Sequence, residues 1–390
     1  MKMSVVGLGQ CGGNVADTLY DISRYSQSMF NRRINIVTDA FAINTDEADL
    51  GGFKHLPQDS GHRILIGTMA TFGHGVGKIN MDAADIIKSS NSVVLDTILR
   101  STKFHDSDAI LVIAGAGGGT GSGTIGWLIK ILKERVDKPV YALLVLPFLF
   151  EEKGETSYAV INSATSFNTV QKYADAVFLF DNECYRHVKS NLSENLTEIN
   201  RAIALNFYDL CCAGEEHRQK FVGSKVIDAG DIRQSLSGIS AIGRGEVELP
   251  LLRWNPTKYR QGIKENSLVF GALRQAETNL GLGIDIEHAR KMLILVTGPK
   301  DYISITVLEE IYNYLERKVP KAVIRIGDYP RRNREISVTL IASELLKVGR
   351  LENTFMQAEY FMKRQDEINH ETVTKIELMR KLNRNIPTLD

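Results

Sequence analysis

A run of nine residues, GAGGGTGSG at 115–123, is the part of this 390-residue chain best suited to bind phosphate. It lies between an apolar segment, 109–114, and an amphipathic segment, 124–132. Glycines leave backbone N–H groups free of Cβ obstruction, and the N-terminus of a following helix adds partial positive charge. Thr120 and Ser122 add hydroxyl groups. The pattern predicts a strand–loop–helix cradle for phosphate oxygens, because a flexible linker would not join two buried-type segments.

A second glycine-rich turn, GLGQCGGN at 7–14, directly follows the apolar segment 3–6. Residues 7–12 satisfy the GxGxxG pattern of dinucleotide-binding proteins. Asp39 ends the next expected strand, where a ribose-binding acid would lie. On their own these features indicate an NAD-dependent oxidoreductase. The additional phosphate loop at 115–123 argues against that interpretation, because a dinucleotide enzyme does not need one.

Composition is that of an ordinary globular protein, with 43% apolar and 24% charged residues. Lys plus Arg equals Asp plus Glu at 47 each, so the chain lacks the basic excess of a nucleic-acid-binding protein. Its four cysteines form no CxxC pair, so we expect no cysteine-based metal site and a reducing, cytoplasmic location. The longest apolar run, 141–150, contains a proline and is too short for direct membrane insertion.

Strand-like and helix-like segments alternate through the first half of the chain. The expected strands are Met3–Val6, Ile34–Thr38, Arg63–Gly67, Ala109–Ala114, Val140–Leu146 and Ala176–Phe180. The expected helices lie near 12–25, 80–101, 122–136 and 157–174. This alternation predicts a parallel sheet with helices on both faces and a ligand at the carboxyl ends of the strands, where the glycine turns fall.

The second half begins with a long helix near 192–213. Apolar residues recur there at three- and four-residue steps, at Leu192, Leu196, Ile199, Ile203, Phe207 and Leu210. A polar, glycine-punctuated stretch at 214–230 follows. Beyond it, the expected strands are Met292–Thr297, Val323–Ile326 and Ile336–Ile341, with helices near 257–279 and 302–317. This second block reads as a smaller α+β domain.

Residues 351–382 predict a long charged helix with Phe355, Ala358 and Met362 on one side, and 383–390 read as a frayed tail. We therefore expect an α/β protein in four parts. They are a phosphate-binding domain at 1–191, a central helix at 192–217, a C-terminal domain at 218–350, and a helix with its tail at 351–390.

Motifs along the chain resemble those of the tubulin and FtsZ superfamily, GTP-binding proteins that assemble into filaments. GGGTGSG at 117–123 resembles the signature loop, and Gln10-Cys11-Gly12 resembles the first loop of tubulin. The further matches are NTD at 44–46, GHGVG at 73–77, PFLFE at 147–151, DNE at 181–183, EIN at 198–200 and ILVTGPKD at 294–301. The resemblance implies a Rossmann-like GTPase domain with a parallel sheet, a long central helix and a smaller α+β C-terminal domain, which is the tubulin/FtsZ fold.

The same resemblance implies a GTP or GDP site, with Mg²⁺ held mainly by the phosphates rather than by protein ligands. The residues it assigns to this site are Gly9, Gln10, Cys11, Gly12, Gly13, Asn14, Asn44, Asp46, Gly75, Gly77, Gly117, Gly118, Gly119, Thr120, Gly121, Glu151, Asn182 and Asn200. Glu151 would contact the ribose, and Gly75 and Gly77 the γ-phosphate, with His74 as a further candidate. An arginine that FtsZ places on the phosphate side corresponds to Glu155 here.

Base recognition is assigned by the resemblance to Asn182 and Asn200. A carboxamide accepts a hydrogen bond from guanine N1–H or N2–H and donates one to O6. The alternative is that Asn182 caps a helix and that Asn200 is a solvated polar residue. Leu196 stands where the superfamily places a base-stacking aromatic side chain, so apolar contact would replace stacking.

VIDAGDIR at 226–233 resembles the NVDxxDV loop of FtsZ, which implies a catalytic role for Asp228 and Asp231. In the superfamily this loop acts on the GTP of the adjacent subunit. Identical chains would then join head to tail into protofilaments and hydrolyse GTP at the joint. The alternative is that both residues are ordinary capping and surface acids.

Tubulin-like and FtsZ-like features are mixed in this chain, and the mixture resembles the archaeal CetZ group, which is associated with cell shape. An FtsZ-type division GTPase is the alternative within the superfamily, followed by plasmid-segregating relatives. Two alternatives belong to other functional classes. One is a structural relative that binds GTP but barely hydrolyses it, and the other is the NAD-dependent oxidoreductase. The expected partner is a second copy of the chain. A membrane adaptor is a further candidate, because 385–389 faintly resembles the FtsZ tail peptide; nucleic acid is not expected.

Overall fold

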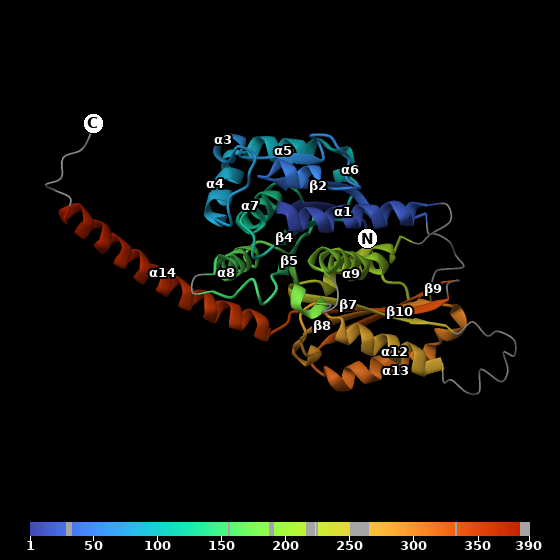
Figure 1. Cartoon of the computed structure of the whole chain (residues 1–390). Helices are drawn as coiled ribbons and strands as arrows, with labels where there is room; N and C mark the ends of the chain where they lie inside the picture. Colours follow the sequence, from blue (N-terminus) through green and yellow to red (C-terminus); the bar gives the residue numbers. More distant parts are fainter. Residues whose placement is uncertain are drawn as a thin grey trace.

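The computed structural model describes residues 1–28, 33–154, 157–186, 191–215, 223, 225–249, 265–331 and 334–382 (Figure 1). Three sequence-based expectations lie outside these residues: the position of Glu155, the first turns of the helix expected near 257–279, and the tail at 383–390 with its adaptor-like segment.

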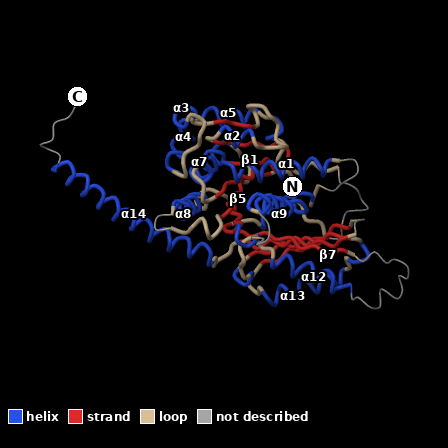
Figure 2. The backbone as a smooth tube through the Cα atoms, in the orientation of Figure 1, coloured by secondary structure: helices blue, strands red, loops and turns tan. Residues whose placement is uncertain are grey.

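Within the described residues, ten strands form one hydrogen-bonded sheet in the order β3-β2-β1-β4-β5-β6-β7-β10-β8-β9. Figure 2 shows the strands in red, with helices in blue around them. The strands are β1 (Met3–Leu8), β2 (Val37–Asn44), β3 (Arg63–Leu65), β4 (Ala109–Gly115), β5 (Val140–Leu146), β6 (Ala176–Asp181), β7 (Gly238–Glu248), β8 (Lys291–Gly298), β9 (Val323–Pro330) and β10 (Glu335–Ser343). The first six strands are all parallel, and their order is that of a doubly wound nucleotide-binding sheet. The predicted fold class is confirmed.

Helices cover both faces of this sheet. They are α1 (Gly9–Gln27), α2 (Glu47–Gly51), α3 (Thr68–Thr71), α4 (Asn80–Ser89), α5 (Asn91–Arg100), α6 (Thr102–His105), α7 (Thr120–Arg135), α8 (Tyr158–Val170), α9 (Leu192–Cys212), α10 (Ala229–Ser235), α12 (Glu265–Thr278), α13 (Ile305–Lys318) and α14 (Gly349–Leu382). Short 3₁₀ segments are η1 (Asn182–Tyr185), η3 (Ile286–His288) and η4 (Lys300–Tyr302).

Side chains of β1 show how the two faces divide. Met3 and Val5 join a core with α1, α9 and α10, whereas Val6 and Leu8 join a core with α4, α5, α7, α12 and α13. Alternate residues of a strand point to opposite faces, so one strand contributes to both cores. A parallel sheet covered on both faces needs such nearly continuous apolar strands.

Helix α9 packs along α1 and against β7, β8 and β10, and so lies between the two halves of the sheet (Figure 1). Ile199, Ile203, Phe207 and Leu210 form its buried stripe, as the helical spacing predicted. Leu192 and Leu196 were expected in the same stripe but are 55% and 38% exposed. They lie in the first turns of α9, beyond the core of the sheet.

Strand β7 joins the two halves and was not predicted from the sequence. It pairs in parallel with β6 and antiparallel with β10. Its glycines weaken the strand pattern in the sequence. In the fold they let α12 approach closely, since a Cβ on Gly245 would lie 1.9 Å from the carbonyl oxygen of Ala272.

Several predicted bounds are corrected by the structure. The strand expected at 34–38 is β2 at 37–44, and the helix expected at 80–101 is two helices that meet at Ser90. On α14, Ala358 and Phe361 pack against α8, whereas Met362 is 52% exposed, so the predicted apolar side was partly wrong. Beyond this contact α14 extends away from the body of the protein (Figure 1).

Replacing Gly245 by alanine should destabilise the fold, because the new methyl group would overlap the backbone of α12. We expect the G245A substitution to lower the free energy of unfolding by about 1–3 kcal/mol, measured by urea denaturation. The matched control is G51A, since a Cβ at Gly51 meets no atom within 4 Å. Equal stability of the two variants would contradict this packing.

Candidate functional site

A cavity of about 450 Å³ opens where β1 and β4 end, which is the point at which the strand order reverses. Doubly wound sheets bind their ligands at this position. The predicted residues that line it are Gly9, Gln10, Cys11, Asn44, Asp46, Gly75, Gly77, Gly117, Gly118, Gly119, Thr120, Gly121, Glu151 and Asn182. Segments far apart in the sequence therefore meet at one site.

Two helices begin at this cavity with no side-chain cap. Helix α1 follows Leu8 and α7 follows Gly119, and neither has a capping side chain or an acid in its first turn. The first N–H groups of a helix lack intrahelical partners and carry partial positive charge. The cavity thus presents two helix N-termini that are suited to bind an anion.

The glycine loop packs directly on the loop at 75–78. A Cβ on Gly119 would lie 2.6 Å from Val76 Cγ2 and 2.9 Å from Lys78 Cα, so only glycine fits there. Asn162 of α8 ties the two loops together through Nδ2, which donates to the carbonyl oxygens of Lys78 (2.9 Å), Gly117 (3.3 Å) and Gly118 (3.1 Å). Sequence reasoning missed Asn162, because a helical asparagine carries no local signal of such contacts.

Asp49 is a second residue that the motifs did not identify. It lines the cavity, and its carboxylate accepts hydrogen bonds from Gln10 Nε2 (2.9 Å) and Asn44 Nδ2 (3.0 Å). Burial raises the pKa of Asp49 above its ordinary value. The carboxylate thereby fixes two predicted site residues from different loops.

Asp46 and Thr45 connect the NTD segment to its neighbours. Asp46 caps α2 by accepting from the Asp49 N–H at 3.0 Å. The hydroxyl of Thr45 lies 2.7 Å from that of Thr120. The NTD segment is therefore joined to the start of α7, on the side of the cavity that the glycine loop forms.

Charge in the cavity is mostly negative. Asp46, Asp49 and Glu151 line it, and Lys78 is the only cationic side chain among the described residues of the wall. His74 forms an isolated backbone bridge with Asp46 and is exposed, so its proposed phosphate contact stays a prediction. Binding of an anion would depend mainly on N–H groups and helix ends.

The opposite end of the cavity is formed by Asn182, Glu151 and apolar side chains. Asp181, not Asn182, caps η1, by accepting from the N–H of Glu183 at 3.0 Å. The cap interpretation of Asn182 was therefore wrong. Asn182 is 7% exposed and lines the cavity, and its Oδ1 has no hydrogen-bond partner within the described structure. A buried acceptor in this state is suited to a donor supplied by a ligand.

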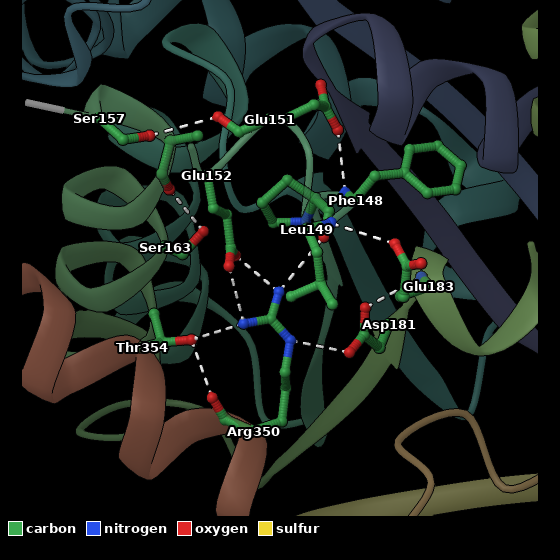
Figure 3. A network of polar contacts seen from close by, with 12 residues as sticks. Phe148, Leu149, Glu151, Glu152, Ser157, Ser163, Asp181, Glu183, Arg350 and Thr354 are labelled. Atoms are coloured by element: carbon green, nitrogen blue, oxygen red, sulfur yellow. Dashed lines mark hydrogen bonds and ion pairs between the residues drawn. The ribbon is translucent and has the colours of Figure 1, made fainter. Parts of the chain in front are cut away.

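Apolar contacts complete this end. Phe148, Phe150, Leu192 and Leu196 line the wall, which explains why the first turns of α9 are not packed in the core. Glu151 lines the wall as well, and its Oε2 accepts from the N–H of Phe148 at 2.9 Å (Figure 3).

Four predicted residues do not line the cavity. Gly12 and Gly13 are buried where α1 packs against Ile113 and Phe53, and Asn14 follows them along α1. Asn200 lies one turn beyond Leu196 on α9, and its contact with a base stays a prediction. Burial raises the pKa of the Cys11 thiol to about 12, so the thiol that lines the cavity is neutral at physiological pH.

Asp39 does not occupy the position that a dinucleotide enzyme would require. It lies within β2 rather than at its end, is 3% exposed, and accepts a hydrogen bond from Ser101 Oγ. His62 Nε2 lies 3.3 Å from its other carboxylate oxygen. Asp39 is therefore held in internal contacts and does not line the cavity, which removes the ribose-binding acid of the oxidoreductase interpretation.

Asp228 and Asp231 form a capping box at the start of α10. Asp228 Oδ1 accepts from the Asp231 N–H at 2.8 Å, and Asp231 Oδ2 accepts from the Asp228 N–H at 3.4 Å. Asp231 Oδ1 also lies 3.6 Å from Arg325 Nε. The capping interpretation is thus correct for their local geometry, and it holds the two carboxylates at a fixed spacing.

This acid pair lies at the far end of α9 from the cavity of its own chain. Leu192 at the start of α9 lines the cavity, and the helix runs 21 residues, or about 30 Å. Just beyond its end, the N–H of Gly214 donates to Tyr329 Oη (2.7 Å), which donates to the carbonyl of Ile227 (2.7 Å). These bonds fix the acid-bearing segment, Asp228 included, to the C-terminal end of α9.

Neither a protein-built metal site nor a membrane span is evident in the part of the chain that the structure describes. No group of three or more His, Cys, Asp or Glu side chains there is placed to hold a metal ion. No described helix combines the length and the apolar run that crossing a bilayer takes.

Two family models together match most of the chain. The Tubulin/FtsZ family GTPase domain matches residues 2–188, and the tubulin-like CetZ C-terminal domain matches 189–360. Tubulin-like protein CetZ3 of Haloferax volcanii is 32% identical over 362 residues, which cover 90% of each chain. The GDP-bound CetZ1 monomer of the same organism has a TM-score of 0.78 at 30% identity and covers 94% of this chain and 100% of its own. The GTPγS-bound CetZ2 protofilament has a TM-score of 0.79 at 28% identity, with the same coverage.

Replacing Asn162 by aspartate should loosen the two loops of the cavity, because a carboxylate cannot donate to the three carbonyl oxygens that Asn162 serves. We expect the N162D substitution to lower stability by about 1–3 kcal/mol and to speed amide exchange at 76–78 and 117–119. Hydrogen–deuterium exchange read by mass spectrometry measures this change. N168D, at an exposed position of the same helix, is the control. Unchanged exchange in N162D relative to N168D would contradict the role of Asn162.

Proposed function

The chain belongs to the tubulin/FtsZ family of GTPases, in its tubulin-like CetZ branch, and on this premise we propose that it binds GTP and GDP in the cavity between β1 and β4. The observation that carries the proposal is the arrangement of the cavity. The uncapped starts of α1 and α7 would hold the phosphates at one end. The buried, unpartnered oxygen of Asn182 would meet the base at the other end.

Guanine suits the orphaned oxygen of Asn182 because its N1–H and N2–H are donors on one edge. Adenine has an acceptor at N1 and no 2-amino group, so adenine bound in the same position would leave this buried acceptor unpaired, at a cost of about 1–3 kcal/mol. In this proposal Glu151 would contact the ribose and Leu192 and Leu196 would contact the base, since all three line this cavity. Asn200, one turn further along α9, is the second proposed base contact.

Magnesium would be bound mainly through the β- and γ-phosphates and water. Asp46, one of three carboxylates that the described part of the chain contributes to the cavity wall, would orient this hydration shell. The ion would neutralise charge that develops on the phosphates during transfer. The residues of this chain would position the phosphates through the N–H groups of the glycine loop and of the loop at 75–78.

Self-assembly is proposed to occur head to tail between identical chains. The cavity and the acid pair lie at opposite ends of α9, so one chain cannot bring them together without unfolding that helix. A heterologous contact between two copies joins them and propagates as an open filament. The CetZ2 relative, a GTPγS-bound protofilament, supports this mode.

Exposed apolar side chains near the phosphate end of the cavity support a protein contact there. Met69 is 94% exposed, Phe72 81% and Met81 75%, and these residues flank the loop at 75–78 that lines the cavity. Exposed large apolar side chains near a binding cavity are candidates for a protein contact. A neighbouring copy that covers them would bring its acid pair toward the γ-phosphate.

In the proposed joint, Asp228 and Asp231 of one copy would orient the attacking water at the GTP of the next. Their capping bonds occupy one oxygen of each carboxylate and fix the pair before the joint forms. Loss of the γ-phosphate would remove contacts of the loop at 75–78 and weaken the joint. Membership of the CetZ branch favours a role of these filaments in cell shape.

Turnover of GTP per subunit should rise with protein concentration, because the proposed hydrolytic site exists only between two copies. We expect a steep rise above a critical concentration and near-zero turnover below it, measured by phosphate release with magnesium present. Light scattering on the same samples reports filament formation. Turnover per subunit that is constant across a hundredfold dilution would rule out the shared site.

The D231N substitution should separate binding from hydrolysis. Asparagine keeps an acceptor for the capping bond to the Asp228 N–H but removes the negative charge. We expect unchanged affinity for GDP and a fall in assembled turnover of about 100-fold or more, the usual scale for a positioned general base. D285N, at another exposed capping aspartate, is the matched control. If D231N instead bound GDP more weakly but kept a normal rate of GTP turnover, the role assigned to Asp231 would be wrong.

A further inference from the structure

Arg350 joins the start of the C-terminal helix to the base-binding end of the cavity (Figure 3). It is the second residue of α14, and its side chain is 12% exposed. NH2 and NH1 donate to the two carboxylate oxygens of Glu152, at 2.6 and 3.0 Å, and Nε donates to Asp181 Oδ2 at 2.8 Å. NH2 also lies 3.3 Å from the carbonyl oxygen of Pro147. One guanidinium thus holds two separate segments of the cavity wall.

The first of these segments is the loop that contains Glu151. Arg350 binds the loop at both ends, at the carbonyl of Pro147 and at the side chain of Glu152. Phe148, Phe150 and Glu151, between those anchors, line the cavity. The position of the proposed ribose-binding residue therefore depends on contacts made by α14.

The second segment is η1, which carries Asn182. Asp181 accepts a hydrogen bond from Arg350 Nε on Oδ2 and caps η1 through Oδ1. The ion pair and the helix cap therefore share one carboxylate. Glu183 of η1 accepts from the N–H of Leu149 at 3.2 Å and so joins η1 to the first loop. Asn182 lies between these fixed points in the chain, and its Oδ1 is buried without a hydrogen-bond partner in the described structure.

Burial makes this arrangement dependent on the arginine. Glu152 and Asp181 have side chains only 4% and 6% exposed. Burial raises the pKa of Asp181 and the positive charge of Arg350 opposes that rise. Without the guanidinium, two buried carboxylates would lose their cationic partner, and the segments that they anchor would move apart or take in water.

We propose that Arg350 is a positioning residue for the base- and ribose-binding end of the cavity, through which nucleotide binding and the seating of α14 are coupled. This inference rests on the proposed binding of guanine nucleotides. Helix α14 spans 34 residues, about 50 Å, and packs on α8 through Ala358 and Phe361. Coupling is reciprocal: a ligand that fixes Asn182 favours the seated helix, and the seated helix favours the ligand.

The test compares the wild type, R350Q and R350K, with R364Q as the matched control, at an arginine of the same helix that pairs with Glu367 of α14 itself. Isothermal titration measures the affinity for GDP and for pyrophosphate, which contacts only the phosphate end. We expect R350Q to weaken GDP binding by tenfold or more and to leave pyrophosphate binding unchanged. R350K, which keeps the charge but loses the planar fork, should give an intermediate loss. R364Q should match the wild type.

A second readout follows α14 itself. GDP should slow amide exchange at 349–362 in the wild type and in R364Q, and should have little effect there in R350Q and R350K. If R350Q does not fold, R350K carries the test. The inference would be overturned if R350K had the same ratio of GDP affinity to pyrophosphate affinity as the wild type. It would also be overturned if the substitutions at Arg350 weakened the affinity for GDP and for pyrophosphate equally. Failure of the wild-type protein to bind GDP would instead contradict the proposed function.

Discussion

The length of α9 is the constraint on which the functional account depends. Its first turns line the cavity, and Gly214, just beyond its last turn, is joined through Tyr329 to the segment that carries Asp228. A helix packed along its length against α1 and the second half of the sheet does not shorten, so the separation of about 30 Å is fixed by the fold. Chemistry that needs both ends of α9 must therefore take place between two molecules.

The two ends of the cavity are built from different kinds of interaction. The proposed phosphate end has one lysine, Lys78, and two acids, Asp46 and Asp49, among the described residues of its wall, and therefore depends on helix N-termini and loop N–H groups. The base end depends on ion pairs behind the wall, centred on Arg350, and on one orphaned acceptor. The first arrangement is built into the glycine loops, whereas the second requires that a helix from the far end of the chain be in place.

This difference explains how much of the site was predictable from the sequence. Glycine loops are local in sequence, so their positions and the parallel sheet that carries them were predicted. The contacts of Asn162 and Arg350 join residues as far as 203 positions apart, and no local pattern marks them. Strand β7 was missed because its glycines, which serve its packing on α12, weaken the strand signal. Asp39 was misplaced because β2 extends beyond the segment in which apolar residues suggested a strand.

The proposed shared hydrolytic site is tested most directly by mixing two variants that should each be inactive alone. G118D places a carboxylate in the phosphate end, at a position where a Cβ meets only one atom, 3.9 Å away, and D231N keeps the cavity but lacks the acid. Each variant alone should release phosphate from GTP near the background rate. A mixture should regain turnover, because the GTP held by D231N meets the intact acids of a G118D neighbour. A mixture no more active than its separate components would contradict the account.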